Sequence, residues 1–394
     1  MTNTSYITGL KCVKCGHEQT DMAARLRCAS CNGYMQAAYD LDAARVSLDR
    51  KAVEGRRGGL WRFREMLPVR SDEHVVSLAE GGAPLIRSRR LGSRLGLKAL
   101  YFKDLTRNPT GSFKDYSSST SVSKARELDV AGIVLVSAGN ASSSFAAYCT
   151  MADIEFHAVT IPGSYPAMLV QNAIYCAINH AAQGTSVDAG RLGSMLAEEH
   201  GFMDGGMPAN PYRVEGKKII GYEIAESLGW KAPARIVCPT AGGTSILALH
   251  KAFTEMQALG WAEGMPALDC IQAESCQPVV QSWRSGEPIV GAKRPDSIAI
   301  GLLSANPEAG PQLVDVMRET GGLGMTVSDD EILDAQASLA REEGLFVEPS
   351  SAASLAGLIK LHRDGRIPDD GPVVLMLTGS GLKAAAAIAT RLGL

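Results

Sequence analysis

The sequence of 394 residues has no long apolar run and no surplus of either charge. No stretch approaches the roughly 18 apolar residues that a membrane-spanning helix needs. The 39 basic and 42 acidic residues give a net charge of −3, which argues against a broad surface for nucleic acid or anionic lipid. The first residues, "MTNTSYITGLKC", lack the basic start and apolar core of a secretion signal. We therefore expect a cytoplasmic protein that binds small molecules, and neither nucleic acid nor membrane.

Internal repeats and low-complexity tracts are also missing, and the chain is too long for one ordinary core. From about residue 97, short apolar runs such as "AGIVLVSAGN", "ARIVCPTAGG" and "PVVLMLTGSG" alternate with helical patterns and end in small polar residues. This alternation predicts an α/β fold with parallel sheets covered by helices. Ligands of such sheets gather at the carboxyl ends of the strands, where these small polar residues lie.

The nine cysteines divide into two groups. Cys12, Cys15, Cys28 and Cys31 form the spacing C-x2-C-x12-C-x2-C, which is typical of a zinc ribbon. Four thiolates complete a tetrahedron and leave no position for water, so we expect a structural Zn²⁺. The other five cysteines lie in apolar stretches and are predicted to be core residues.

An arginine-rich connector, "SLDRKAVEGRRGGLWRFREM", follows the cysteine cluster. Its mixed charges and glycines predict a solvated linker that runs into a short helix.

A glycine-rich turn, "PTAGGTS", lies between the apolar "ARIVC" and the helical "ILALHKAF". Its glycines allow backbone amides at a helix N-terminus to face an anion. The turn lacks the G-x-x-x-x-G-K-[ST] form of a nucleotide-binding loop, so the anion need not belong to ATP. We expect the phosphate of a cofactor here, although such a turn alone can be only a turn.

Lys114 lies in the polar stretch "NPTGSFKDYSSST", where a loop becomes a helix. An isolated lysine is usually a surface cation. A lysine together with a phosphate-binding turn is what pyridoxal phosphate requires, because this cofactor needs an imine-forming amine and an anion site.

Six motifs in order resemble the fold-type II, or tryptophan-synthase-β-like, pyridoxal phosphate enzymes, and among these the threonine synthase family. They are "EGGAPLI", "NPTGSFKD", "SAGN", the glycine turn, "EPSSAASL" and "LTGSGLK". Several threonine synthases are also similar in having an N-terminal zinc ribbon. The resemblance implies two parallel-sheet domains behind the ribbon: residues 1–40 form the ribbon, residues 41–110 and 207–394 the large cofactor-binding domain, and residues 111–206 a smaller mobile domain. It also implies a homodimer.

The same resemblance implies roles for single residues. Lys114 would be the Schiff-base lysine, Asn140 would bind the ring hydroxyl of the cofactor, and the neutral hydroxyl of Thr378 would face the pyridine nitrogen. The phosphate would be held by Ala241, Gly242, Gly243, Thr244 and Ser245.

Substrate-binding roles are implied for Ser137, Ala138, Gly139, Tyr116 and Arg213. Arg213 lies in "NPYRVEGKK" and would hold an anionic group of an amino-acid substrate, because guanidinium suits phosphate. The chain departs from the family where "FKDYS" replaces "FKDRG" and "SAGNA" replaces "STGNT". Tyr116 and the serines after it either reshape the substrate pocket or form the polar first turn of a helix.

The implied reaction is the conversion of O-phosphohomoserine and water to threonine and phosphate by a pyridoxal phosphate-dependent lyase. The alternative is β-elimination or β-replacement, because "SAGN" is more similar to serine and threonine dehydratases and "TAGGT" to cysteine synthases. A partner-binding protein without activity is the third hypothesis. The presence of Lys114, Asn140 and Thr378 argues against it.

Overall fold

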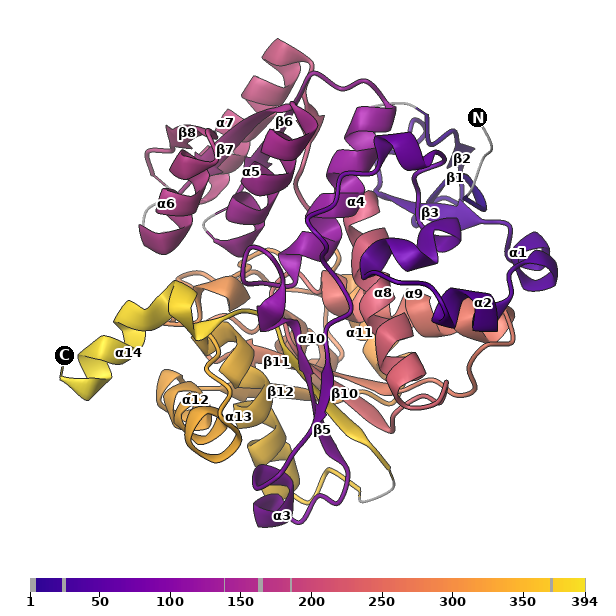
Figure 1. Ribbon diagram of the computed structural model, residues 1–394. Coiled ribbons are helices and arrows are strands. Elements are labelled where there is room, and N and C mark those ends of the chain that lie inside the picture. The colour runs from indigo at the N-terminus through magenta and orange to yellow at the C-terminus, as the bar shows by residue number, and fades with distance from the viewer. Residues whose placement is uncertain are drawn as a thin grey trace.

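The chain forms two mainly parallel sheets and a small N-terminal sheet (Figure 1). The structure is a computed structural model that describes residues 5–22, 26–137, 139–161, 166–184, 186–368 and 371–393. The larger sheet has the strand order β12 (Gly324–Val327), β11 (Ala267–Ala273), β10 (Arg235–Pro239), β13 (Val373–Leu377), β5 (Leu100–Asp104) and β4 (Leu85–Arg87). All its pairs are parallel except β4 with β5.

The smaller sheet has the order β8 (Ile178–Ala181), β7 (Glu155–Thr160), β6 (Gly132–Val136) and β9 (Met203–Asp204), with every pair parallel. The N-terminal sheet is antiparallel, in the order β2 (Glu18–Gln19), β1 (Ile7–Cys12) and β3 (Met35–Tyr39). The parallel sheets confirm the predicted fold class. The predicted domain limits at residues 110 and 206 stay predictions, although all strands of the smaller sheet lie between these limits.

Helices cover both faces of the larger sheet. Within single strands, alternate side chains enter different clusters: Ile236 and Cys238 pack with α8 (Tyr212–Ser227) and α9 (Thr244–Ala258), whereas Val237 packs with α12 (Asp329–Glu343) and α13 (Pro349–Arg363). This double burial explains why the parallel strands consist of continuous apolar runs. The other helices of the large region are α3 (Leu91–Leu95), α10 (Pro278–Ser285), α11 (Gly310–Glu319) and α14 (Ala385–Leu392).

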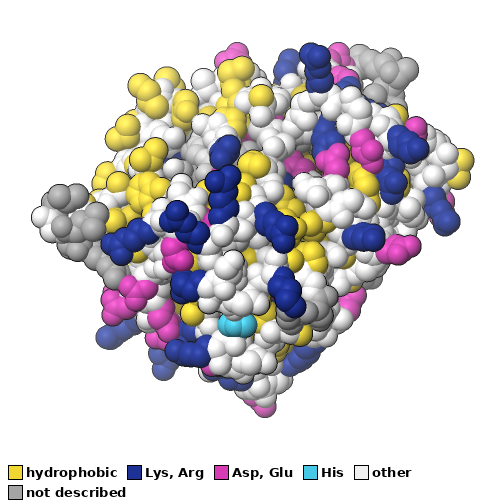
Figure 2. Space-filling model, turned by 60° about the horizontal axis from the view of Figure 1, so that its bottom comes forward, with side chains coloured by type: hydrophobic (Ala, Val, Ile, Leu, Met, Phe, Trp, Pro, Cys, Tyr) yellow, Lys and Arg dark blue, Asp and Glu magenta, His cyan; other side chains and the backbone are white. Residues whose placement is uncertain are grey.

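The smaller sheet is covered by α5 (Asn140–Ala152), α6 (Pro166–Ile174) and α7 (Ser186–His200). Exposed apolar side chains gather on these elements: Met151, Leu169, Val170, Ile174, Ile178, Val187 and Met195. Figure 2 shows apolar side chains at its upper left, the side on which α6 and β8 lie in Figure 1. Elsewhere on that face, basic and acidic side chains are interspersed.

Helix α4 (Lys114–Glu127) lies between α5 and α8, and most of its buried side chains carry hydroxyl groups. The Thr120 hydroxyl donates to the carbonyl of Tyr212 on α8 at 2.9 Å. The α4 and α8 backbones are so close that a Cβ on Gly216 would lie 1.9 Å from the Tyr116 carbonyl oxygen. The serine run is therefore a packing surface between helices, where small side chains allow close approach.

Helix α1 (Leu41–Ser47) leads into the connector, which contains α2 (Arg50–Glu54) and the 3₁₀ helix η1 (Leu60–Met66). The predicted short helix is present as η1, and Leu60, Phe63 and Met66 bury it in the main core. The residues before it are mostly exposed, as a solvated linker requires. Arginines of the connector also have acidic partners: Arg56 binds Glu65 at 2.7 Å, and Arg62 binds Glu226. Burial of the apolar residues between the arginines fixes the connector on the large region.

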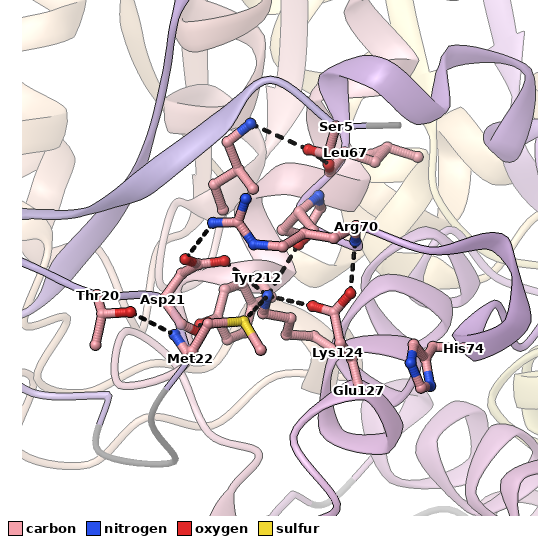
Figure 3. A network of polar contacts seen from close by, with 12 residues as sticks. Ser5, Thr20, Asp21, Met22, Leu67, Arg70, His74, Lys124, Glu127 and Tyr212 are labelled. Atoms are coloured by element: carbon pink, nitrogen blue, oxygen red, sulfur yellow. Dashed lines mark hydrogen bonds and ion pairs between the residues drawn. The ribbon is translucent and has the colours of Figure 1, made fainter. Parts of the chain in front are cut away.

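A buried ionic network joins the N-terminal sheet region to the two helices that border the site (Figure 3). Lys124 near the end of α4 binds Asp21 at 2.7 Å and also binds Glu127, and Arg70 binds the other oxygen of Asp21 at 2.6 Å. The Tyr212 hydroxyl, at the start of α8, donates to the Asp21 carbonyl at 3.0 Å. The segment around Asp21 is thus held against both α4 and α8.

No helix in the described part of the chain is both long and apolar enough to cross a bilayer.

Candidate active site

A cavity of about 330 Å³ opens at the carboxyl ends of strands from both parallel sheets. Its walls come from the turn after β10, from the turn after β13, from the end of β6 with the start of α5, and from the start of α4. The predicted site residues among its lining are Lys114, Ser137, Gly139, Asn140, Ala241, Gly242, Gly243, Thr244, Ser245 and Thr378. Ala138 lies outside the described residues.

Lys114 is the first residue of α4 and is fixed by the backbone around it. The amide of the preceding Phe113 donates to the Thr378 carbonyl at 2.9 Å, which ties the start of α4 to the end of β13. The Lys114 Nζ atom lies 4.3 Å from the centroid of the Phe113 ring. Burial, with the charge of Arg213, lowers the pKa of Lys114 to about 8. A substantial fraction of this amine is therefore neutral near physiological pH and can act as a nucleophile.

The turn from Pro239 to Ser245 carries the helix N-terminus that the sequence predicted. Gly243 caps α9 with a φ of +80°, and a Cβ there would lie 1.9 Å from Leu313 Cδ1. Only glycine fits this turn without strain. The first amides of the 15-residue helix α9 are thereby left at the cavity, where the helix dipole favours an anion.

Lys217 borders the same turn, although sequence reasoning did not select it. It is 1% exposed, and its Nζ atom donates to Thr244 Oγ1 at 2.6 Å. Burial and the positive charges of Lys114 and Arg213 hold the pKa of Lys217 well below its usual value. The available signal was its spacing: Arg213 and Lys217 are four residues apart on α8 and share one face of the helix.

Arg213 lies behind the cavity wall and is not part of its lining. Its Nη1 atom donates to the Gly205 carbonyl at 2.9 Å, and its Nε atom has no hydrogen-bond partner among the described residues. Burial lowers the pKa of Arg213 to about 10. The guanidinium is nevertheless close enough to Lys114 to influence the pKa of that amine.

Asn140 and Glu348 meet across the cavity. The Asn140 side-chain amide donates to Glu348 Oε2 at 2.8 Å, and Asn140 Oδ1 has no partner among the described residues. Burial raises the pKa of Glu348. Glu348 was not predicted as a site residue, although its place before the proline that starts α13, in "EPSSAASL", was a usable signal. Thr378 points its hydroxyl toward Ser351 Oγ at 2.9 Å.

Tyr116 requires a correction, because it does not line the cavity. Its side chain is fully buried beneath the site, and its hydroxyl donates to Glu223 Oε2 at 2.8 Å. Ser117 and Ser118 also point into helix contacts: Ser117 donates to the Lys114 carbonyl at 2.8 Å, and Ser118 meets Ser144 at 2.7 Å. The expectation that these residues reshape a substrate pocket is therefore wrong for this structure.

Comparison with known proteins identifies the family. Residues 76–379 match the family model of the pyridoxal-phosphate dependent enzymes. The chain belongs to this family. It is 36% identical over 376 residues to the threonine synthase of Methanocaldococcus jannaschii, covering 95% of this chain and 92% of that protein. The threonine synthase of Methanosarcina acetivorans is 36% identical over 381 residues, with 95% and 92% covered.

Solved structures show the fold-type II architecture. Maize serine racemase superposes with a TM-score of 0.67 at 18% identity, covering 79% of this chain and 93% of that chain. A threonine deaminase from T.th. superposes with a TM-score of 0.64 at 22% identity, covering 76% and 92%. The family match and the threonine synthase relatives confirm the prediction that this pyridoxal-phosphate dependent enzyme is a threonine synthase-like lyase.

The residues present fit the cofactor of this family. The amine of Lys114 and the N-terminus of α9 open into one cavity, as an aldehyde and a phosphate on one molecule require. The unpartnered Oδ1 of Asn140 is a buried acceptor, and the Thr378 hydroxyl offers a neutral polar contact. Lys114 and Arg213 disfavour the charged form of Lys217, and a bound anion would favour it.

The four N-terminal cysteines of this pyridoxal-phosphate dependent enzyme lie together. Their sulfur atoms are within 4.8 Å of one another, with 3.5 Å between Cys12 and Cys31 and 3.7 Å between Cys15 and Cys28. Sulfurs around one tetrahedral zinc ion are about 3.8 Å apart, given Zn–S bonds of about 2.3 Å. The cluster therefore suits a metal ion. Of the other cysteines, Cys176 is exposed, so its predicted place in the core is wrong.

Proposed function

We propose that this enzyme converts O-phosphohomoserine and water to threonine and phosphate. The observation that carries the proposal is the convergence of three basic side chains: Arg213 lowers the pKa of Lys114, and Lys114 and Arg213 both lower the pKa of Lys217. The phosphate of the cofactor would balance only part of the positive charge that these three groups can carry. A second phosphate, on the substrate, would balance the rest. The relatives named threonine synthase, matched over nearly their whole length, support the same reaction.

Pyridoxal phosphate supplies, when bound, the electron withdrawal that makes the α-hydrogen of an amino acid acidic. Lys114 and the N-terminus of α9 would hold it, with Asn140 and Thr378 beside its ring. In the net reaction the C–O bond at the γ carbon breaks and phosphate leaves with that oxygen. The β carbon loses one hydrogen and bonds to the oxygen of water, and the γ carbon gains a hydrogen.

The Lys114 amine is the group that moves protons in this scheme. Because its pKa is about 8, the amine can accept a proton from the α carbon of the substrate at near-neutral pH. It can then return a proton to another carbon of the substrate. Arg213 would bind the departing phosphate. Its free Nε atom and its burial suit a charge-assisted hydrogen bond to an oxygen dianion.

The direct test incubates the loaded enzyme with O-phosphohomoserine in ¹⁸O-labelled water. We expect phosphate and threonine in equal amounts, with ¹⁸O in threonine and none in phosphate, because the bond at carbon breaks. Lys114→Ala is the control for background hydrolysis. Labelled phosphate would indicate simple ester hydrolysis. No phosphate release, together with ammonia release from serine or threonine, would replace the proposal with β-elimination.

We also propose that the N-terminal cysteines bind one structural Zn²⁺. The backbone amides of Lys14 and Ser30 point to the sulfurs of Cys12 and Cys28, at 3.4 Å each, which supports thiolates at these positions. Metal analysis of the purified protein should find one zinc per chain.

We propose, finally, that the protein is a homodimer. Its mass in light scattering tests this proposal.

A further inference from the structure

Four lysines of the described chain are less than 2% exposed: Lys103, Lys124, Lys217 and Lys218. Three of them have carboxylate partners. Lys103 binds Glu223 at 2.6 Å, Lys124 binds Asp21 at 2.7 Å as drawn in Figure 3, and Lys218 binds Glu215 at 2.7 Å. This is the usual arrangement, because burying an unpaired ammonium is costly.

Lys217 has no carboxylate partner among the described residues. Its ammonium contacts the hydroxyl of Thr244 and lies 5.2 Å from the centroid of the Phe113 ring. Its charged neighbours on the adjoining elements are the cations Lys114 on α4 and Arg213 on α8 itself, and both disfavour its positive charge. Burial among these groups favours the neutral amine of Lys217, and a bound anion would favour its charged form.

The position of Lys217 indicates which anion this is. Thr244 is the first residue of α9 and lines the cavity directly after Gly243. Lys217 is not among the residues that line the cavity, and its ammonium lies directly behind the Thr244 hydroxyl, from where it can act on an anion at the first amides of α9. Arg213, by contrast, is held by Gly205 near β9 and belongs to the smaller sheet's side of the site.

We propose that the Lys217 ammonium, together with the Thr244 hydroxyl and the N-terminal amides of α9, binds the phosphate of pyridoxal phosphate. Lys217 thus adds a full charge to an anion site otherwise built from backbone amides and hydroxyl groups. This inference rests on the family and on the site, and it holds whichever amino acid is the substrate.

The test compares two ligands that differ only in the phosphate. Apoprotein is titrated with pyridoxal phosphate and with pyridoxal, and the absorbance of the bound form gives both dissociation constants. Lys217→Met should weaken pyridoxal phosphate binding by about tenfold to a hundredfold, the range of one charge-assisted hydrogen bond. Pyridoxal binding should change by less than about twofold. Lys217→Arg, which keeps the charge, should restore much of the preference for the phosphorylated ligand.

Lys218→Met is the matched control, because Lys218 is the next residue and is equally buried. It should leave the ratio of the two dissociation constants unchanged while lowering the melting temperature, since Glu215 and Glu255 lose their buried partner. Lys217→Met should leave the melting temperature of the apoprotein unchanged or raise it, because a buried amine without a carboxylate partner among the described residues has been removed.

Three outcomes would overturn the proposal. Equal weakening of both ligands would assign Lys217 to general packing, as would a destabilised Lys217→Met apoprotein. Unchanged binding of both ligands, combined with a raised KM for O-phosphohomoserine in the loaded variant, would assign the ammonium to the substrate's phosphate instead.

Discussion

The side-chain amide of Asn140, at the start of α5, donates to Glu348 Oε2, at the start of α13, over 2.8 Å. This hydrogen bond joins the smaller-sheet side of the cavity to the larger-sheet side. It depends on a carboxyl group whose pKa is raised by burial. Glu348 is thus a contact between the two halves of the site and a group whose charge opposes folding.

Replacing this carboxyl group should make stability less dependent on pH. The folded pKa of Glu348 is above the unfolded value of about 4.3, so the wild type loses stability as pH rises from the unfolded pKa through the folded pKa. Glu348→Gln keeps an acceptor for Asn140 and has no such loss. Its advantage in unfolding free energy should grow by at most about 1.4 kcal/mol per pH unit in that interval and then stay constant. Urea denaturation of both apoproteins from pH 4 to 8 measures this difference. An advantage that shrinks as pH rises would contradict the raised pKa.

Lys114→Ala should abolish turnover and leave the fold intact. The loss in kcat should be at least about a thousandfold, because no other amine among the described residues lines the cavity. The circular dichroism spectrum should match that of the wild type, since alanine suits the first turn of a helix. Turnover within about tenfold of the wild type would remove Lys114 from the reaction.

Arg213→Ala should distinguish a phosphorylated substrate from a serine-like one. Each charge-assisted hydrogen bond contributes about 1.5 to 3 kcal/mol, so kcat/KM for O-phosphohomoserine should fall by about tenfold to several hundredfold. On serine or threonine the same change should cost less than about tenfold. Arg213→Lys keeps the charge without the planar fork and should recover part of the loss. A near-neutral Arg213→Ala on the best substrate would favour β-elimination or β-replacement.

Removing two of the four clustered thiols with Cys12→Ser and Cys15→Ser should loosen the N-terminal region without releasing the cofactor. Amides near Asp21 should exchange hydrogen faster, because this segment lies beside the cysteines and contacts Lys124 and Tyr212. Pyridoxal phosphate should stay bound at one equivalent, since no cavity-lining residue belongs to the N-terminal sheet. Cofactor loss in this variant would show that the ribbon supports the active-site core directly.

The sequence predicted the parts of the site that rest on local pattern. Continuous apolar runs indicated buried parallel strands, and the small polar residues at their ends indicated where ligands bind. Gly243 and Lys114 were found because a turn at a helix N-terminus and an amine at a loop end have recognisable neighbours along the chain.

The direction of a side chain around a helix was harder to predict. Lys217 and Lys218 are identical in the sequence, yet one faces the cofactor turn and the other faces two glutamates. Tyr116 follows Lys114 by two residues, and this spacing places the two side chains on different sides of α4. Which neighbour each side meets depends on the packing of α4 against α8. The hydrophobic periodicity of the sequence could not predict this packing, because α4 lacks an apolar stripe.

The hydroxyl-lined contact between α4 and α8 has a consequence for how the protein can vary. With Gly216 pressed against the Tyr116 carbonyl and Thr120 bonded to Tyr212, neither backbone can retreat from a bulkier neighbour. In a saturation library, positions 117 to 121 and 216 should accept only the smallest residues, although none of them lines the cavity. Lys114, at the start of the same helix, would then keep its position because its neighbours along α4 are restricted in size.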